Sequence, residues 1–186
     1  METPLAPERL VDQLKAAVRG IRDFPKEGIV FRDITPVLAD PALLSQVVAR
    51  IAEPYTDQGI QLVAGTEARG FIFAPAVALQ LGAGFVPIRK AGKLPAATYQ
   101  ATYDLEYGTD TLEMHRDAFT PGTRVLMVDD LLATGGTMKA CCDMVEEAGG
   151  QIAACAFLVE LSFLGGRDRL APHNVLSLVT YASEDE

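Results

Sequence analysis

The sequence is poor in positive charge. Its 16 lysine and arginine residues stand against 25 aspartate and glutamate residues, which gives a formal net charge of −9. General binding to nucleic acid or to an anionic membrane surface needs a basic field, so this charge argues against both kinds of partner. Any anion that the protein binds must therefore be held by a local group of donors.

Cysteine and long apolar runs are also scarce. Cys141, Cys142 and Cys155 are an odd number, and none lies in a CxxC motif or beside histidine at metal-ligand spacing. We interpret them as buried thiols of a reducing compartment. No apolar stretch approaches the 18 residues of a transmembrane helix, and residues 1–4 lack the features of a signal peptide. We therefore expect a soluble, cytoplasmic protein.

The chain of 186 residues has no internal repeat, low-complexity tract or flexible linker, so we expect one domain over 1–186. Apolar segments alternate with helical ones, which is typical of an α/β protein with a parallel sheet covered on both faces. The expected strands are 62–64, 85–88, 125–128 and 152–159, and the expected helices are 10–21, 41–51, 70–81 and 137–148.

This alternation fails between residues 91 and 123. Gly92, Pro95, Gly108 and Gly122 interrupt short stretches there, so we expect no regular element. A long irregular insertion in a compact domain is usually a functional lid or a disordered segment. The residues alone leave both interpretations open.

The most informative motif is VLMVDDLLATGGT at 125–137. An apolar strand runs into two adjacent carboxylates, Asp129 and Asp130, and then through a Thr/Gly-rich turn into a helix. Ligands of parallel α/β sheets bind beyond the carboxyl ends of the strands. The two carboxylates should therefore lie in a ligand site.

The turn after the carboxylates, residues 133–137, suits a phosphate, and we call it the phosphate turn. Gly135 and Gly136 allow a tight turn whose N–H groups can hold an anion, and Thr134 and Thr137 add hydroxyl donors. Ionised carboxylates only accept hydrogen bonds, so they suit sugar hydroxyls or a divalent cation. Together they predict a ribose 5-phosphate site. A Walker-type ATP site is disfavoured because Lys139 is not followed by Ser or Thr. The alternative is that these residues merely form a turn.

Two other places carry basic residues. Arg69 lies in GTEARG (65–70), near an expected helix N-terminus, where it could hold a phosphate or simply cap a surface turn. Arg89, Lys90 and Lys93 form a small basic cluster that could bind an anion or be solvated.

Segment 128–137 resembles the phosphoribosyl-diphosphate motif of the type I phosphoribosyltransferases, in the form found in their adenine-specific branch. The resemblance covers most of the chain in the family's order, through 21–33 (IRDFPKEGIVFRD), 67–71 (EARGF), 85–95 (FVPIRKAGKLP), 105–108 (LEYG) and 158–170 (LVELSFLGGRDRL). It implies the type I phosphoribosyltransferase fold: a central, mainly parallel sheet flanked by helices, a small N-terminal hood (about 1–35), a core (about 36–186) and a flexible lid loop (about 91–123).

The resemblance also implies a reaction. Adenine and 5-phosphoribosyl 1-diphosphate would give AMP and diphosphate, in purine salvage. Mg2+ would be the cofactor, held mainly through the substrate, with Asp129 or Asp130 joining through water. A homodimer is implied, with Arg89 reaching the site of the neighbouring subunit.

The family's phosphoribosyl-diphosphate contacts fall on the following residues: Asp129, Asp130, Ala133, Thr134, Gly135, Gly136, Thr137, Glu67, Ala68, Arg69, Arg89, Lys90 and Lys93. A cis peptide bond between Glu67 and Ala68 would turn their N–H groups toward the ligand. The resemblance makes Arg69, Glu106 and Tyr107 catalytic, with Glu106 as the lid's general acid/base at purine N7 and Tyr107 near ribose C1.

For adenine, the resemblance implies stacking between Phe31 and Leu131, with hydrogen bonds to the backbone C=O of Val30 and the backbone N–H of Arg32. A 6-oxopurine would place its carbonyl against that C=O, leaving two acceptors facing each other. Ala133 stands where the hypoxanthine-guanine branch carries an aspartate. Both features favour adenine over hypoxanthine or xanthine.

A regulator that senses phosphoribosyl diphosphate while binding DNA or RNA is the alternative from another class. The acidic charge and the presence of Glu106 disfavour it. The resemblance makes residues 65–70 the pyrophosphate loop of the family. The chain departs from the family pattern at Glu27, Thr66 and Ala74, and an extra Cβ at Ala74 could shift the helix after the pyrophosphate loop. We expect both histidines, His115 and His173, to be structural.

Overall fold

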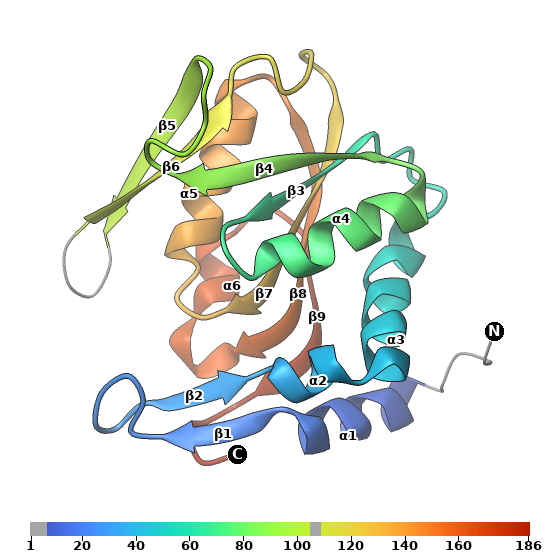
Figure 1. The fold of residues 1–186 in the computed structure, drawn as a ribbon, viewed down its shortest axis with the longest axis vertical. Coiled ribbons are helices and arrows are strands. Elements are labelled where there is room, and N and C mark those ends of the chain that lie inside the picture. Colours follow the sequence, from blue (N-terminus) through green and yellow to red (C-terminus); the bar gives the residue numbers. More distant parts are fainter. Residues whose placement is uncertain (1–6, 105–108) are drawn as a thin grey trace.

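A seven-stranded sheet forms the centre of the protein (Figure 1), which the computed structural model describes at residues 7–104 and 109–186. Its strand order is β5-β6-β4-β3-β7-β8-β9. The parallel strands are β3 (Leu62–Thr66), β4 (Gly84–Lys90), β7 (Arg124–Leu132), β8 (Gln151–Leu161) and β9 (Val175–Tyr181). The antiparallel hairpin of β5 (Thr98–Asp104) and β6 (Thr109–His115) extends the sheet beyond β4. The expected mainly parallel sheet is confirmed.

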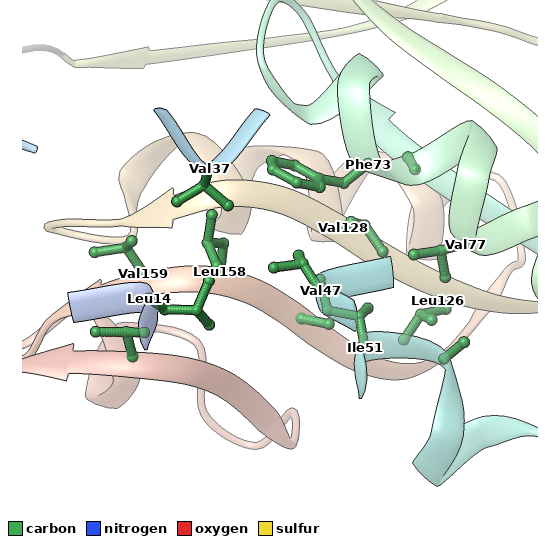
Figure 2. Close-up of a cluster of buried hydrophobic side chains, with 14 of the residues drawn as sticks. Leu14, Val37, Val47, Ile51, Phe73, Val77, Leu126, Val128, Leu158 and Val159 are labelled. Carbon is green, nitrogen blue, oxygen red and sulfur yellow. The ribbon is translucent and has the colours of Figure 1, made fainter. Parts of the chain in front are cut away.

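Helices cover both faces of this sheet (Figure 1). They are α1 (Pro7–Ala17), α2 (Thr35–Ala39), α3 (Pro41–Ala52), α4 (Gly70–Leu81), α5 (Gly136–Glu147) and the short α6 (Gly166–Arg169), with 3-10 turns η1 (Glu53–Tyr55) and η2 (Ser162–Leu164). One core cluster joins α1, α3 and α4 to the sheet, and Figure 2 shows Val47 and Ile51 of α3 near Val77 and Leu126. The other cluster packs α5 on the opposite face.

The position of β7 in the sheet explains the apolar run of its residues 125–128. Leu126 and Val128 belong to the first cluster, whereas Val125 and Met127 belong to the second. Successive side chains of a strand point to opposite faces, so a strand covered on both faces needs an unbroken apolar run.

Local signals located α3 and α4 correctly. Asp40 caps α3 by accepting hydrogen bonds from Ala42 N at 2.8 Å and Leu43 N at 3.1 Å, and Pro41 is the first helical residue. Helix α4 begins at Gly70 and ends at Leu81, before Gly82 in the left-handed region.

The expected opening helix was too long. It ends at Ala17, and Ile21 lies instead in β1 (Arg19–Arg22), where its side chain is 40% exposed. β1 pairs antiparallel with β2 (Val30–Asp33) in a separate two-stranded sheet, which lies in the range expected to form the hood. Gly20 disfavours helix, and pairing with β2 stabilises the extended conformation there.

The expectation of no regular structure at 91–123 was also wrong, because β5 and β6 lie in this range. Leu112 and Met114 of β6 are buried, and β6 pairs with β4 through Arg89 and Lys90. The sequence did not indicate this pairing because the partners are distant along the chain. Residues 105–108, which include Glu106 and Tyr107, lie outside the described residues.

All three cysteines are buried, as expected. Cys142 Sγ lies 3.6 Å from Cys155 Sγ, and Cys141 Sγ lies 3.6 Å from the hydroxyl of Thr66. Burial raises the pKa of the Cys141 thiol, and the contact with Cys155 together with burial raises that of Cys142. Over residues 7–104 and 109–186, no helix has the length and apolar character needed to cross a membrane.

Candidate active site

A cavity of about 280 Å3 lies at the carboxyl ends of β3 and β7. Its walls come from the two anion-binding segments that the sequence suggested separately: Thr66, Glu67, Ala68, Arg69, Asp129, Asp130, Leu131, Leu132, Ala133, Thr134, Gly135, Gly136, Thr137 and Met138. β3 and β7 are adjacent parallel strands, so the loops that follow them meet at one edge of the sheet.

The carboxylate pair sits within β7, which continues to Leu132 rather than ending at Val128 as expected. The strand is longer because Asp129 and Leu131 pair with Phe157 and Val159 of β8. Asp129 Oδ1 accepts the backbone N–H of Asp130 at 2.9 Å. Strand pairing therefore fixes the backbone that carries both carboxylates.

Burial raises the pKa of both carboxyls. For Asp129, the nearby charge of Asp130 adds to the effect of burial. For Asp130, which is 5% exposed, burial raises the pKa and the Arg69 guanidinium opposes this rise. The site therefore places partly desolvated acids beside one cation.

Arg69 lies near both the carboxylate pair of β7 and the strand β2. Its Nε lies 2.8 Å from Asp130 Oδ2, and its Cζ lies 5.3 Å from the centre of the Phe31 ring. Phe31 also packs edge-on against Phe24, with ring centres 5.2 Å apart. The arginine therefore lies between the carboxylate pair and the aromatic proposed for the base.

The phosphate turn has the glycine that its geometry requires. Gly135 has a φ of 78°, and a Cβ there would lie 2.7 Å from Gly166 O. A Cβ on Gly166 would in turn lie 2.2 Å from Ala133 O. The start of α6 thus backs the phosphate turn. Sequence reasoning missed this role, although Gly166 lies in a segment that resembles the family.

The peptide bond between Glu67 and Ala68 is cis, as the resemblance implied. Glu67 Oε2 accepts from Lys90 N at 3.1 Å and from Arg89 Nε at 3.3 Å. The hydrogen bond from Lys90, with the Arg89 guanidinium, lowers the pKa of Glu67 despite its partial burial. The loop that follows β3 is therefore joined to the basic cluster of Arg89, Lys90 and Lys93.

The basic cluster stands beside this cavity rather than in its described lining. Arg89 donates to Lys93 O at 3.1 Å, and Lys90 Nζ lies 3.5 Å from Asp110 Oδ2 of β6. Within one chain, Arg89 is thus held by Glu67 and the Lys93 carbonyl.

The residues expected to bind adenine are divided between two elements. Leu131 lines the cavity, whereas Val30, Phe31 and Arg32 form most of the hood strand β2. The side chain of Arg32 lies over the ring of Tyr181, with its Cζ 3.9 Å from the ring centre.

Two of the departures from the family pattern, Thr66 and Ala74, have local explanations. A Cβ on Gly65 would lie 2.5 Å from the Cβ of Ala74, so glycine at 65 leaves the room that Ala74 occupies. The hydroxyl of Thr66 is buried beside Cys141. His173 Nε2 lies 3.6 Å from Glu146 Oε1, away from the cavity lining.

Known proteins match this chain over most of its length. The family model of the phosphoribosyl transferase domain matches residues 37–177. The adenine phosphoribosyltransferase of Chloroflexus aurantiacus is 56% identical, over 90% of this chain and 97% of its own. That of Nitrosococcus oceani is 53% identical, over 92% of this chain and 100% of its own.

Solved structures agree. The adenine phosphoribosyltransferase of Rhodothermus marinus superposes with a TM-score of 0.88 at 50% identity, covering 94% of this chain and 99% of its own. That of Saccharomyces cerevisiae, solved with an imino-altritol bisphosphate and adenine, has a TM-score of 0.87 at 39% identity, covering 92% and 99%. The chain therefore belongs to the adenine phosphoribosyltransferases, a branch of the phosphoribosyltransferase family.

Proposed function

We propose that the protein transfers the phosphoribosyl group of 5-phosphoribosyl 1-diphosphate to adenine, releasing diphosphate and forming AMP for purine salvage. One observation carries the proposal: a single cavity brings the phosphate turn, the buried carboxylate pair and the pyrophosphate loop together at the ends of β3 and β7. This set of groups suits a ligand with a phosphate, a sugar diol and a second anionic group.

Each group has a defined task in displacing diphosphate from ribose C1. The N–H groups at the start of α5 and the hydroxyls of Thr134 and Thr137 bind the 5-phosphate. Asp129 and Asp130 accept hydrogen bonds from the ribose hydroxyls and stabilise the positive charge that develops on the sugar. Arg69, whose Nε lies 2.8 Å from Asp130 Oδ2, would neutralise charge on the departing diphosphate.

Further groups complete the diphosphate site and manage the purine proton. Lys90 and Lys93 lie in and just after β4, next to the pyrophosphate loop. Glu106 and Tyr107 connect β5 to β6 in the sequence. We assign Glu106 as general acid/base at purine N7 and place Tyr107 near ribose C1.

Mg2+ is the proposed cofactor. No group of three or more metal-ligating side chains is present among the described residues, and the cavity offers the two carboxylates of Asp129 and Asp130. Such a donor set fits an ion that keeps water and substrate oxygens among its ligands. When bound, Mg2+ would neutralise charge on the diphosphate.

Adenine specificity follows from the proposed contacts with β2. The base stacks between Phe31 and Leu131, the C=O of Val30 accepts from its exocyclic amine, and the N–H of Arg32 donates to N1. A purine with a carbonyl at that position leaves acceptors unpaired. A buried site can discriminate against such a purine by a factor of roughly 10⁴ in kcat/KM.

A homodimer completes the proposal. Helix α4 is apolar on nearly every side, and its Ile72 and Leu79 remain exposed, Leu79 by 83%. A second copy would cover such a face, and Arg89 would then reach the neighbouring site. The proposed location is the cytoplasm.

The test is to mix the protein with phosphoribosyl diphosphate and Mg2+ and to offer adenine, hypoxanthine, guanine or xanthine separately. Nucleotide formation is followed by absorbance. We expect AMP from adenine and no product from the 6-oxopurines. Turnover of a 6-oxopurine would contradict the contacts assigned to Val30 and Arg32, and tight phosphoribosyl-diphosphate binding without turnover would favour a sensor.

A further inference from the structure

The segment that follows β9 packs against the hood strand expected to bind adenine. β9 ends at Tyr181, and Figure 1 shows the chain from there lying beside the hood strands. We call residues 182–186 the clasp segment. Its contacts with β2 join residues more than 150 positions apart in the sequence.

Arg32 provides the strongest of these contacts. Its Nη1 donates to Glu186 O at 2.9 Å, and its Nη2 donates to Glu184 O at 2.9 Å and to Ser183 O at 3.4 Å. The side chain also lies over the Tyr181 ring, and Arg32 is only 5% exposed. A desolvated guanidinium needs such partners, and the backbone carbonyls of the clasp segment supply them.

Glu184 holds β2 at a second point. Its Oε2 accepts the backbone N–H of Val30 at 3.1 Å. The N–H and C=O of one residue in an extended strand project along the same edge. Glu184 therefore fixes the edge of β2 that carries the C=O proposed to accept the adenine amine.

The clasp segment is itself anchored. The side-chain carboxylate of Glu186 forms an ion pair with Lys15 of α1 and accepts a hydrogen bond from Ala182 N at 2.7 Å. These hydrogen bonds and the Lys15 charge lower the pKa of Glu186. The segment thus connects α1 to β2 and closes on itself.

We propose that the clasp segment positions β2 for adenine, with Glu184 and the Arg32 side chain as positioning residues. The inference rests on the proposed function, because it takes Val30 and Arg32 as the backbone groups that bind the base. Adenine binding should depend on the clasp, whereas the phosphoribosyl-diphosphate site, built on β3 and β7, should not.

The test measures kcat and both KM values in point variants of the full chain. We expect Glu184→Ala to raise the KM for adenine about tenfold, since a hydrogen bond to a charged group is lost. Its kcat and its KM for phosphoribosyl diphosphate should stay near those of the wild type. Glu184→Gln keeps an oxygen acceptor for Val30 N–H and should restore most of the adenine affinity. Arg32→Met should raise the KM for adenine further.

Two matched controls accompany these variants. Tyr181→Phe keeps the ring beneath Arg32 and removes a buried hydroxyl for which the described structure shows no hydrogen-bond partner. Asp185→Asn changes a side chain of the same segment that is 85% exposed and 3.6 Å from Arg22. Both should retain the KM of the wild type for adenine.

Two results would overturn the inference. One is an unchanged KM for adenine in both Glu184→Ala and Arg32→Met. The other is an equal loss of kcat and both substrate affinities together with a lowered melting temperature, which would indicate a purely structural role. A wild-type protein that forms no AMP would instead refute the proposed function.

Discussion

At the scale of single residues, burial of the carboxylate pair of β7 makes the free energy of unfolding depend on pH. The pKa of Asp129 is raised by burial and by the charge of Asp130, so the native protein holds this proton more tightly than the unfolded chain. The stability contributed by this group is therefore complete below the ordinary carboxyl pKa of about 3.9 and is lost as the pH rises through the native value. Ionisation of Asp129 as the pH rises therefore lowers the free energy of unfolding.

Asp129→Asn should consequently stabilise the protein at pH 7. An asparagine cannot ionise, and its side-chain oxygen can still accept the N–H of Asp130. We expect the melting temperature to rise by about 2–4 °C, while turnover falls because a carboxylate facing the ribose hydroxyls is lost. Calorimetry and the AMP assay measure the two effects. The exposed Asp57→Asn removes the same charge and should change neither, and a lower melting temperature in Asp129→Asn would contradict the argument.

Glu106→Gln tests the lid residue. We expect turnover to fall by about 10² to 10⁴ because the amide cannot exchange a proton with purine N7. Binding of phosphoribosyl diphosphate, measured by calorimetry, should stay nearly intact. Normal turnover in this variant would remove Glu106 from the mechanism.

Most of the site was predictable at this scale because its residues are close in sequence. The carboxylates, threonines and glycines of 129–137 form one motif, and the structure places all of them in one cavity. The contact of Gly166 with the phosphate turn and the hydrogen bond from Val30 of β2 to Glu184 were not predictable, because each joins residues that are distant in the chain.

At the scale of elements, β3 and α4 approach each other through Gly65 and Ala74. Gly65→Ala would place a Cβ 2.5 Å from that of Ala74 and 3.2 Å from Gly70 O. We expect a loss of about 1–3 kcal/mol in the free energy of unfolding, measured by urea titration.

Ala74→Gly provides the matched partner for a double-mutant cycle. It should cost about 1 kcal/mol alone as a glycine in a helix. Combined with Gly65→Ala, it should restore part of the lost stability, because one of the two close contacts disappears. Strict additivity of the two changes would show that the Cβ atoms do not meet.

The predictability of whole elements depended on where their signals lie. Helix α3 was located by Asp40 and Pro41, which act within one turn. Strands β6 and β9 were missed because they pair with strands elsewhere in the chain, β6 with β4 and β9 with β8, and β5 was missed together with its hairpin partner β6. In β9, Ser177 and Thr180 also interrupt the apolar pattern.

At the scale of the whole molecule, the exposed apolar residues of α4 predict self-association. Leu79→Glu should dissociate the dimer at concentrations where the wild type remains dimeric, since a carboxylate would be buried at the interface. Activity should fall with it, because Arg89 would no longer reach the neighbouring site. Sedimentation equilibrium measures the mass. Leu164→Glu, at another exposed leucine, should leave the dimer intact, and a monomeric wild type would contradict the prediction.

Because all three cysteines are buried, the rate at which a thiol reagent labels them measures local opening of the structure. Two of them lie in α5 and one in β8, within the same core cluster. A thiol reagent can reach them only when that layer opens, so its rate of labelling reports how often the layer opens. Slow, simultaneous modification of all three would mean that α5 and the sheet behind the phosphate turn separate as one cooperative unit.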